Sequence, residues 1–144
     1  MITVQQVFDA AIHMMDEQYE LNGNTVTTDT NEYKYRTISI LNTVMPALYP
    51  FSDTYNKEFE HGRPMCPMLA LPESYKDPDF EQMVPLDDTL ASGVLPYALA
   101  AHLLAAENAE LSAWFLARYT QVFADIRSKI PAEFESIPMP YGAF

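Results

Sequence analysis

The side chains of this sequence that most readily do chemistry are one cysteine, Cys66, and three histidines, His13, His61 and His102. His61 and Cys66 lie five residues apart, and a cysteine–histidine pair can act as a nucleophile with its general base. The sequence offers no third residue that would orient the histidine, and a single cysteine is more often a small buried apolar side chain. Catalysis by Cys66 is therefore the less favoured interpretation.

The other two histidines lie in stretches with helical periodicity. His13 and Glu17 are four residues apart, which puts them on one face of a helix. Two ligands are too few to hold a metal ion, so we expect an exposed polar pair. His102 lies in the most apolar stretch of the chain, and we expect a buried, hydrogen-bonded histidine there rather than a catalytic base.

Carboxylates are frequent between residues 77 and 88, and alternating carboxylates can bind calcium. The residues 77–81 (DPDFE) lack the glycine at which an EF-hand loop turns, so we expect a solvated acidic loop that ends in a helix cap at Asp88. Glycine-rich phosphate loops, nucleophile elbows and zinc-protease motifs are also missing from the sequence. We therefore expect no enzyme activity, no metal site and no cofactor.

Composition limits the class of protein. A chain of 144 residues with 49% apolar residues has the size and core of one globular domain, residues 1–144. A formal charge of −12 argues against a protein that grips nucleic acid, because phosphate binding requires positive charge. Cys66 alone cannot form an internal disulfide. We also expect neither a membrane span nor a signal peptide, since residues 94–106 are too short an apolar run and no basic region opens the chain.

Apolar residues recur at spacings of three and four, which predicts an all-α fold of about four helices in a small bundle. Thr3 and Gln6 fit a capping box for the first helix, Asp87 and Asp88 are suitable N-cap residues for the third, and Asn108 is a suitable N-cap for the fourth. Pro46 predicts a kink or an early end in the second, and Pro96 predicts that the first turns of the third form a separate short helix. The third helix is apolar almost all round and should be central, and Trp114, with neighbouring aromatic residues of the fourth helix, should join the core. The expected helices span residues 3–20, 31–49, 88–107 and 109–130.

Residues 51–87 form a different kind of segment, with five of the eleven prolines and an excess of acidic residues. We expect a long loop, with a possible short strand at residues 68–71, that packs partly on the helices or on a neighbouring subunit. Residues 132–144 should form an extended apolar tail after Pro131. Apolar side chains in both segments are candidate partner contacts: Phe59, Tyr75, Phe80, Ile137, Met139, Tyr141 and Phe144.

The second half of the sequence contains an acidic cap, an alanine-rich helix, an E-N turn and a helix with aromatic residues, in that order. The residues of this pattern are Pro85-Leu86-Asp87-Asp88, residues 95–104 (LPYALAAHLL), Glu107-Asn108, Phe115 and Tyr119. This pattern resembles the head–tail connector proteins (adaptor or head-completion proteins) of tailed phages and prophages, and residues 30–49 resemble the second helix of that family. The resemblance covers most of the chain except residues 51–83.

The resemblance implies a helical subunit that assembles as a ring, often twelve-fold, between the portal protein and the next neck or tail protein. Such a subunit would be found in the virion neck, or in the host cytoplasm during assembly. The acidic balance is compatible with a channel wall that does not hold passing DNA. The residues alone also leave open an acidic binding or regulatory module of the host or prophage, and a small enzyme that uses His61 and Cys66.

Overall fold

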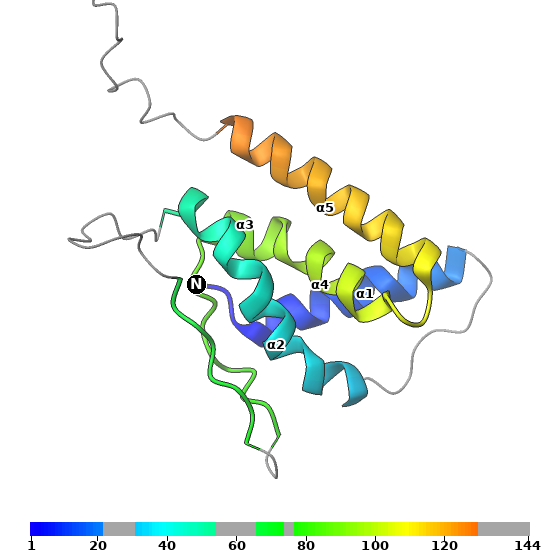
Figure 1. Ribbon diagram of the computed structural model, residues 1–144, viewed down its shortest axis with the longest axis horizontal. Helices are drawn as coiled ribbons and strands as arrows, with labels where there is room; N and C mark the ends of the chain where they lie inside the picture. Colours follow the sequence, from blue (N-terminus) through cyan, green and yellow to red (C-terminus); the bar gives the residue numbers. More distant parts are fainter. Residues whose placement is uncertain (22–30, 54–65, 74–76, 130–144) are drawn as a thin grey trace, which may run out of the picture.

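The computed structural model of this chain describes residues 1–21, 31–53, 66–73 and 77–129, and its fold is all-α (Figure 1). Within these ranges the only β-type contact is an isolated bridge between Thr3 and Met83. None of the helices in these ranges is both long and apolar enough to cross a lipid bilayer. The elements are α1 (Val4–Leu21), α2 (Asn31–Leu48), the 3-10 turn η1 (Tyr49–Phe51), α3 (Asp88–Gly93), α4 (Leu95–Leu104) and α5 (Ala109–Lys129).

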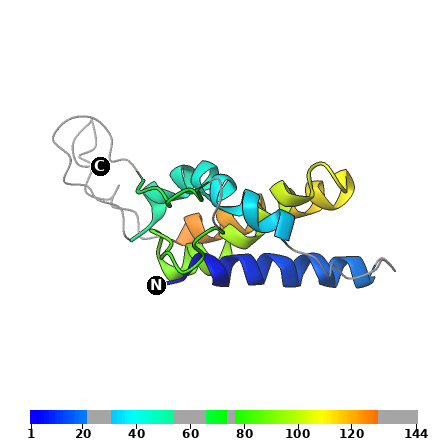
Figure 2. The ribbon, with the colours of Figure 1, turned by 90° about the horizontal axis from the view of Figure 1, so that it is seen from below.

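Helix α4 is central, as its composition predicts. It lies between α5 and α2 in Figure 1 and between α1 and α2 in Figure 2, and it contacts each of these helices. Because neighbouring helices cover α4 on several sides, its apolar residues occur around most of its circumference and are not confined to one stripe. Its buried residues are Leu95, Pro96, Ala98, Leu99, Ala100, Ala101, Leu103 and Leu104.

The two helical prolines act differently. Pro96 lies in the first turn of α4, where a missing N–H costs no helical hydrogen bond, and Val94 separates α3 from α4. This confirms the predicted short helix. Pro46 lies inside α2, which continues to Leu48 and then tightens into η1, so the helix ends within a turn of the proline.

Helix starts follow the predicted caps. The Thr3 hydroxyl accepts the Gln6 N–H at 3.2 Å, and the Gln6 side chain accepts the Thr3 N–H at 2.9 Å, which completes the capping box. Asp87 accepts the Leu90 N–H at 2.8 Å and caps α3. Asn108 accepts the Leu111 N–H at 3.1 Å at the start of α5.

The described part of the 51–87 segment packs on the helices. Residues 80–84 bind the start of α1: the carbonyl of Phe80 accepts the Gln5 N–H at 2.9 Å, and that of Gln82 accepts the Val4 N–H at 3.0 Å. The Phe80 ring lies 5.2 Å from the Phe8 ring. These contacts satisfy N–H groups that a helix start leaves unpaired.

The strand predicted at residues 68–71 is wrong, because side-chain amides take the place of a partner strand. Asn42 accepts the Leu69 N–H at 2.8 Å and donates to the Leu69 carbonyl at 3.0 Å. Gln82 pairs in the same way with Ala70, at 2.6 and 3.0 Å. Two carboxamides thus satisfy backbone groups that a β-ladder would otherwise pair.

Candidate functional site

The histidine predicted to be buried is exposed instead. His102 lies in the last turn of the mostly buried α4, on a side that no described element covers. A helix that is apolar all round does not reveal which sector stays open, and the sequence-based prediction fails for that reason. His13 and Glu17 lie on an exposed side of α1, as expected. His61 lies outside the described residues.

Cys66 is half-buried, and its thiol lies 3.4 Å from the carbonyl oxygen of Pro67. Burial raises the pKa of this thiol. A raised pKa lowers the thiolate fraction at neutral pH, and the thiolate is the nucleophilic form. The surroundings of Cys66 therefore disfavour the nucleophile that a cysteine–histidine mechanism requires.

The acidic loop residues act as local acceptors. Asp77 accepts a hydrogen bond from the Tyr35 hydroxyl at 3.2 Å, and Asp79 accepts the Glu81 N–H at 3.0 Å. In the part of the chain that the structure describes, no three His, Cys, Asp or Glu side chains gather closely enough to hold a metal ion. Asp77 thus joins the loop to α2, and Asp79 stabilises a turn within the loop.

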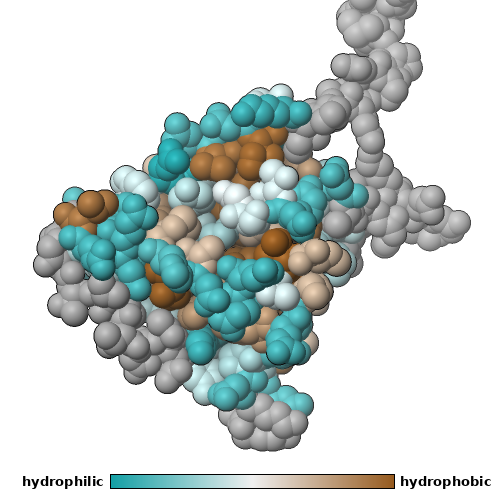
Figure 3. All heavy atoms as spheres, turned by 180° about the vertical axis from the view of Figure 1, so that it is seen from behind, coloured by the Kyte–Doolittle hydropathy of each residue, from teal (hydrophilic) through white to brown (hydrophobic). Residues whose placement is uncertain are grey.

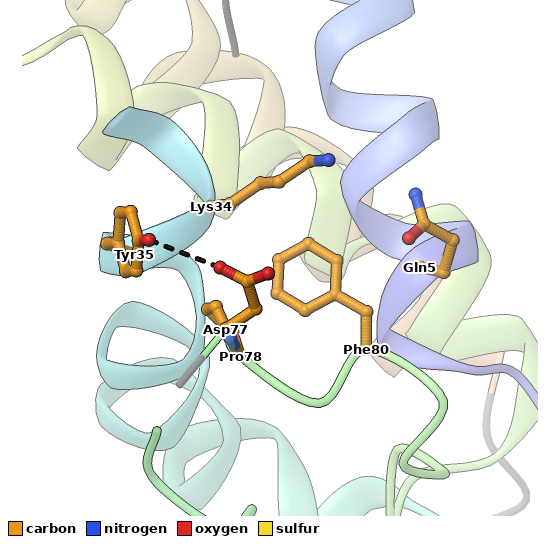
Figure 4. A pocket seen from close by; sticks show the side chains of 6 residues that line it. All are labelled: Gln5, Lys34, Tyr35, Asp77, Pro78 and Phe80. Atoms are coloured by element: carbon orange, nitrogen blue, oxygen red, sulfur yellow. Dashed lines mark hydrogen bonds between the residues drawn. The ribbon is translucent and has the colours of Figure 1, made fainter. Parts of the chain in front are cut away.

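A small polar pocket lies where this loop meets α1 and α2 (Figure 4). Its volume is about 160 Å³, which is below the range of about 300–1,000 Å³ typical of ligand pockets. The Tyr35–Asp77 hydrogen bond lies on one side of it, and the Phe80 ring lies between Asp77 and Gln5. The pocket suits loop attachment better than ligand binding. Its lining residues are Gln5, Lys34, Tyr35, Asp77, Pro78 and Phe80.

One of the predicted contact residues belongs to the core. Phe80 is 8% exposed and packs on Phe8, so the loop uses this ring to attach itself to α1 and does not offer it to a partner. The remaining predicted contacts lie outside the described residues: Phe59, Tyr75, Ile137, Met139, Tyr141 and Phe144.

An aromatic cluster joins η1 to the end of α5. The rings of Phe51 and Phe123 meet edge to face, with centroids 5.4 Å apart. The Arg127 guanidinium lies 5.8 Å from the Phe51 centroid and 5.4 Å from that of Phe123. We call these three residues the end cluster. The cluster brings the chain just before residues 54–65 next to the chain just before residues 130–144.

A larger groove lies between α1 and α5, above the start of α4. Both helices pack on α4, and α5 packs mainly there, so the space between α1 and α5 stays open. The groove measures about 490 Å³, within the range of ligand pockets. We call it the α1–α5 groove. Its lining residues are Met14, Glu17, Gln18, Tyr97, Trp114, Phe115 and Arg118.

The rim of the α1–α5 groove is rich in residues that bind proteins tightly. Trp114 is 42% exposed and meets Phe115 edge to face at 5.0 Å, and the Arg118 guanidinium lies 5.8 Å from the Tyr97 ring centroid. Figure 3 views the molecule from the side of α1 and shows brown hydrophobic areas interrupted by hydrophilic ones on this face. Trp, Tyr and Arg are the residues most enriched at energetic centres of interfaces.

The sequence reasoning missed this groove because it placed Trp114 in the core. Only Phe115 of that pair is fully buried, while Tyr119 and Phe123 are half-buried. Adjacent helical residues point about 100° apart, so Trp114 and Phe115 cannot both face α4. The rotation between these adjacent residues is the feature of the sequence that predicts an exposed Trp114 once Phe115 is buried.

Comparison of the chain with protein-family models, with curated proteins and with solved structures finds no match.

Proposed function

We propose that this chain is a structural subunit of a tailed phage or prophage, a head–tail connector that assembles as a ring between the portal protein and the tail. Its partners are then the portal protein, a neck or tail protein and further copies of itself. It acts in the virion neck and, during assembly, in the host cytoplasm. The proposal starts from the resemblance of residues 85–119 and 30–49 to that family.

The end cluster is the observation that carries the proposal furthest. It joins Phe51 to Phe123 and Arg127, which directly precede the two segments with candidate contact residues. Asp53 and the chain start lie at the same end: the Asp53 N–H donates to Asp87 at 3.1 Å, and the Met1 amine lies 3.7 Å from Asp88. The chain start, Asp53 and Arg127 therefore lie at one end of the described bundle, and we expect the partner contacts of residues 54–65 and 130–144 to begin there.

The net charge supports the same function. A formal charge of −12 gives the molecule a surface that repels phosphate. A connector ring surrounds the exit path of the genome, and a repulsive wall lets DNA slide without binding. Structural contacts to protein partners, rather than contacts to nucleic acid, are the expected source of specificity.

The test begins with the gene neighbourhood and continues with co-expression. Portal, terminase or capsid genes upstream and tail genes downstream are expected. The full chain is co-expressed with the portal protein that the same gene neighbourhood encodes. The two proteins should co-purify, and electron microscopy should show an additional ring on the portal. A neighbourhood of metabolic genes, together with no co-purification, would overturn the proposal.

The high acidic charge also favours one alternative, a binding or regulatory module that sequesters a basic partner. Binding dominated by charge weakens steeply as salt rises. A basic host protein that is captured at low salt and released at moderate salt would favour this alternative. A portal complex that persists at moderate salt would favour the connector.

A further inference from the structure

We infer that residues 137–144 of one copy bind in the α1–α5 groove of the next copy. The inference rests on the proposed function in one respect: a ring needs a head-to-tail contact that each copy makes and accepts. It names the two surfaces of that contact, the groove on one side and the end of the chain on the other.

The groove has the chemistry of a peptide-binding site. Trp114 and Tyr97 offer aromatic surface, and Met14 offers a side chain that adapts to irregular shapes. Aromatic-lined grooves bind extended proline-containing segments, because such segments are already stiff and lose little entropy on binding. The groove therefore selects for an extended, apolar, proline-containing occupant.

Residues 137–144 (IPMPYGAF) have the matching composition. Pro138 and Pro140 alternate with apolar side chains, and Tyr141 and Phe144 supply aromatic rings. Each ring can stack on an aromatic wall, and such pairs contribute beyond the area they bury. Pro138 and Pro140 are the only two prolines of the sequence that a single residue separates.

Charge agrees with this assignment. Arg118 lies at the rim over Tyr97, donates to Gln121 at 2.9 Å and forms no ion pair within the described ranges. Glu17, the acidic residue of the rim, forms none there either. The incoming segment follows two carboxylates, Glu133 and Glu135, which can meet Arg118 at the edge of the groove.

Residues 130–144 are long enough to reach a groove, and the direction of the chain at the end of α5 favours the groove of a second copy. Arg118 lies eleven residues before Lys129, about 16 Å along α5. Fifteen extended residues span about 50 Å. Binding in the same copy would require the chain to reverse at the end of α5 and run back along it. Binding in a neighbouring copy requires no reversal.

Photo-crosslinking of the full chain tests the inference. A light chain with p-benzoylphenylalanine at position 141 is mixed with a heavy-isotope chain that lacks the probe, at millimolar concentration. We expect crosslinks between the light probe and heavy residues of the groove, above all Met14, Tyr97 and Trp114. Light-to-light crosslinks alone, crosslinks to another surface, or none would each overturn the inference.

Two variants of α5 provide a matched pair. Trp114→Ala in the heavy chain should reduce the crosslink yield by about tenfold or more, because the main aromatic wall is lost. Leu116→Ala, at an exposed side chain two residues away that does not line the groove, should change the yield by less than about twofold. Equal losses in both variants would overturn the inference, and circular dichroism checks that both fold.

The crosslinking experiment and the portal co-purification experiment test the two proposals separately. Co-purification with a portal protein tests the connector assignment and does not depend on where residues 137–144 bind. A portal complex without heavy–light crosslinks would retain the connector and reject the groove contact. Crosslinks in the groove without any portal binding would retain the contact and reject the connector.

Discussion

Asn42 shows how a single side chain can replace a strand. It is 8% exposed on α2 and pairs with both the N–H and the carbonyl of Leu69, itself 5% exposed. A buried backbone group without a partner costs about 1–3 kcal/mol. Asn42 therefore attaches the proline-rich segment to the bundle at a point where the segment has no ladder of its own.

Asn42→Ala should lower the free energy of unfolding by about 2–4 kcal/mol, because it leaves both polar groups of buried Leu69 unpaired. Urea titration followed by circular dichroism measures the loss. The control is Gln82→Ala, which removes the same pairing from exposed Ala70 together with a hydrogen bond to the Asp79 carbonyl, and which should cost about 1 kcal/mol, since water can replace these bonds. A smaller loss for Asn42→Ala than for Gln82→Ala would contradict this account.

A hydrogen bond from Tyr33 joins α2 to the residues that follow α4. Tyr33 is 6% exposed, and its hydroxyl donates to Glu107, just beyond the end of α4. Burial, and then the hydrogen bond to Glu107, raise the pKa of Tyr33 above its usual value of 10.0. Burial also raises the pKa of Tyr19 and of Tyr119. In the folded state these tyrosines thus hold their protons more tightly than in the unfolded chain.

Alkaline pH should therefore destabilise the protein. The contribution of Tyr33 is fully present below pH 10, where both states are protonated, and is lost as pH rises further, because the unfolded state releases its proton first. Urea midpoints at pH 7, 9, 10 and 11 should fall above pH 10. Tyr33→Phe should flatten that fall, whereas Tyr35→Phe, at an exposed tyrosine of the same helix, should not. If the urea midpoints of wild type and Tyr33→Phe fall in parallel above pH 10, Tyr33 is not the source of the alkaline destabilisation.

At the scale of elements, α4 organises the bundle. It contacts α1, α2, α3 and α5, and Pro96 starts it without loss of a hydrogen bond. Ala100 and Ala101 are buried, and their small side chains suit the close approach of neighbouring helices. The Ser112 hydroxyl of α5 donates to the Ala101 carbonyl at 2.7 Å, which adds a polar contact between α4 and α5.

Ala101→Asp should destabilise the fold strongly, by about 3 kcal/mol or more, because Ala101 is 4% exposed and the new carboxylate has no partner. Thermal melting followed by circular dichroism measures it. Ala113→Asp, at an exposed position in the first turns of α5, is the control and should stay within about 0.5 kcal/mol. An unchanged melting temperature for Ala101→Asp would show that α4 is not the centre of the core.

At the scale of the whole molecule, the described elements share one core. Hydrophobic residues of α1, α2, α3, α4 and α5 and of residues 66–73 and 77–87 form one buried cluster. We expect residues 137–144 to serve assembly rather than this core. Stability and assembly should then be separable.

Deletion of residues 137–144 should leave the helical signal and the melting temperature close to wild type while it abolishes self-association and ring formation with the portal. Circular dichroism measures the first property, and sedimentation velocity and electron microscopy measure the second. Loss of the helical signal would mean that these residues belong to the fold. Intact rings in the deletion variant would mean that assembly uses another surface.

The sequence by itself determined what depends on near neighbours: the helices to within a few residues, the caps at Thr3, Asp87 and Asn108, and the separation of α3 from α4 at Pro96. Capping and proline effects act within one turn of helix, so one-dimensional spacing contains them. The all-α class followed from the same periodicity.

Only the tertiary structure decided which surfaces meet. The exposure of His102, the burial of Phe80 against Phe8 and the amide pairing of Leu69 each depend on residues far apart in the chain. The α1–α5 groove exists because both helices pack on α4 with an open space between them. Side-chain spacing predicts which face of one helix is apolar, but the packing of several helices determines which part of that face stays open to a partner.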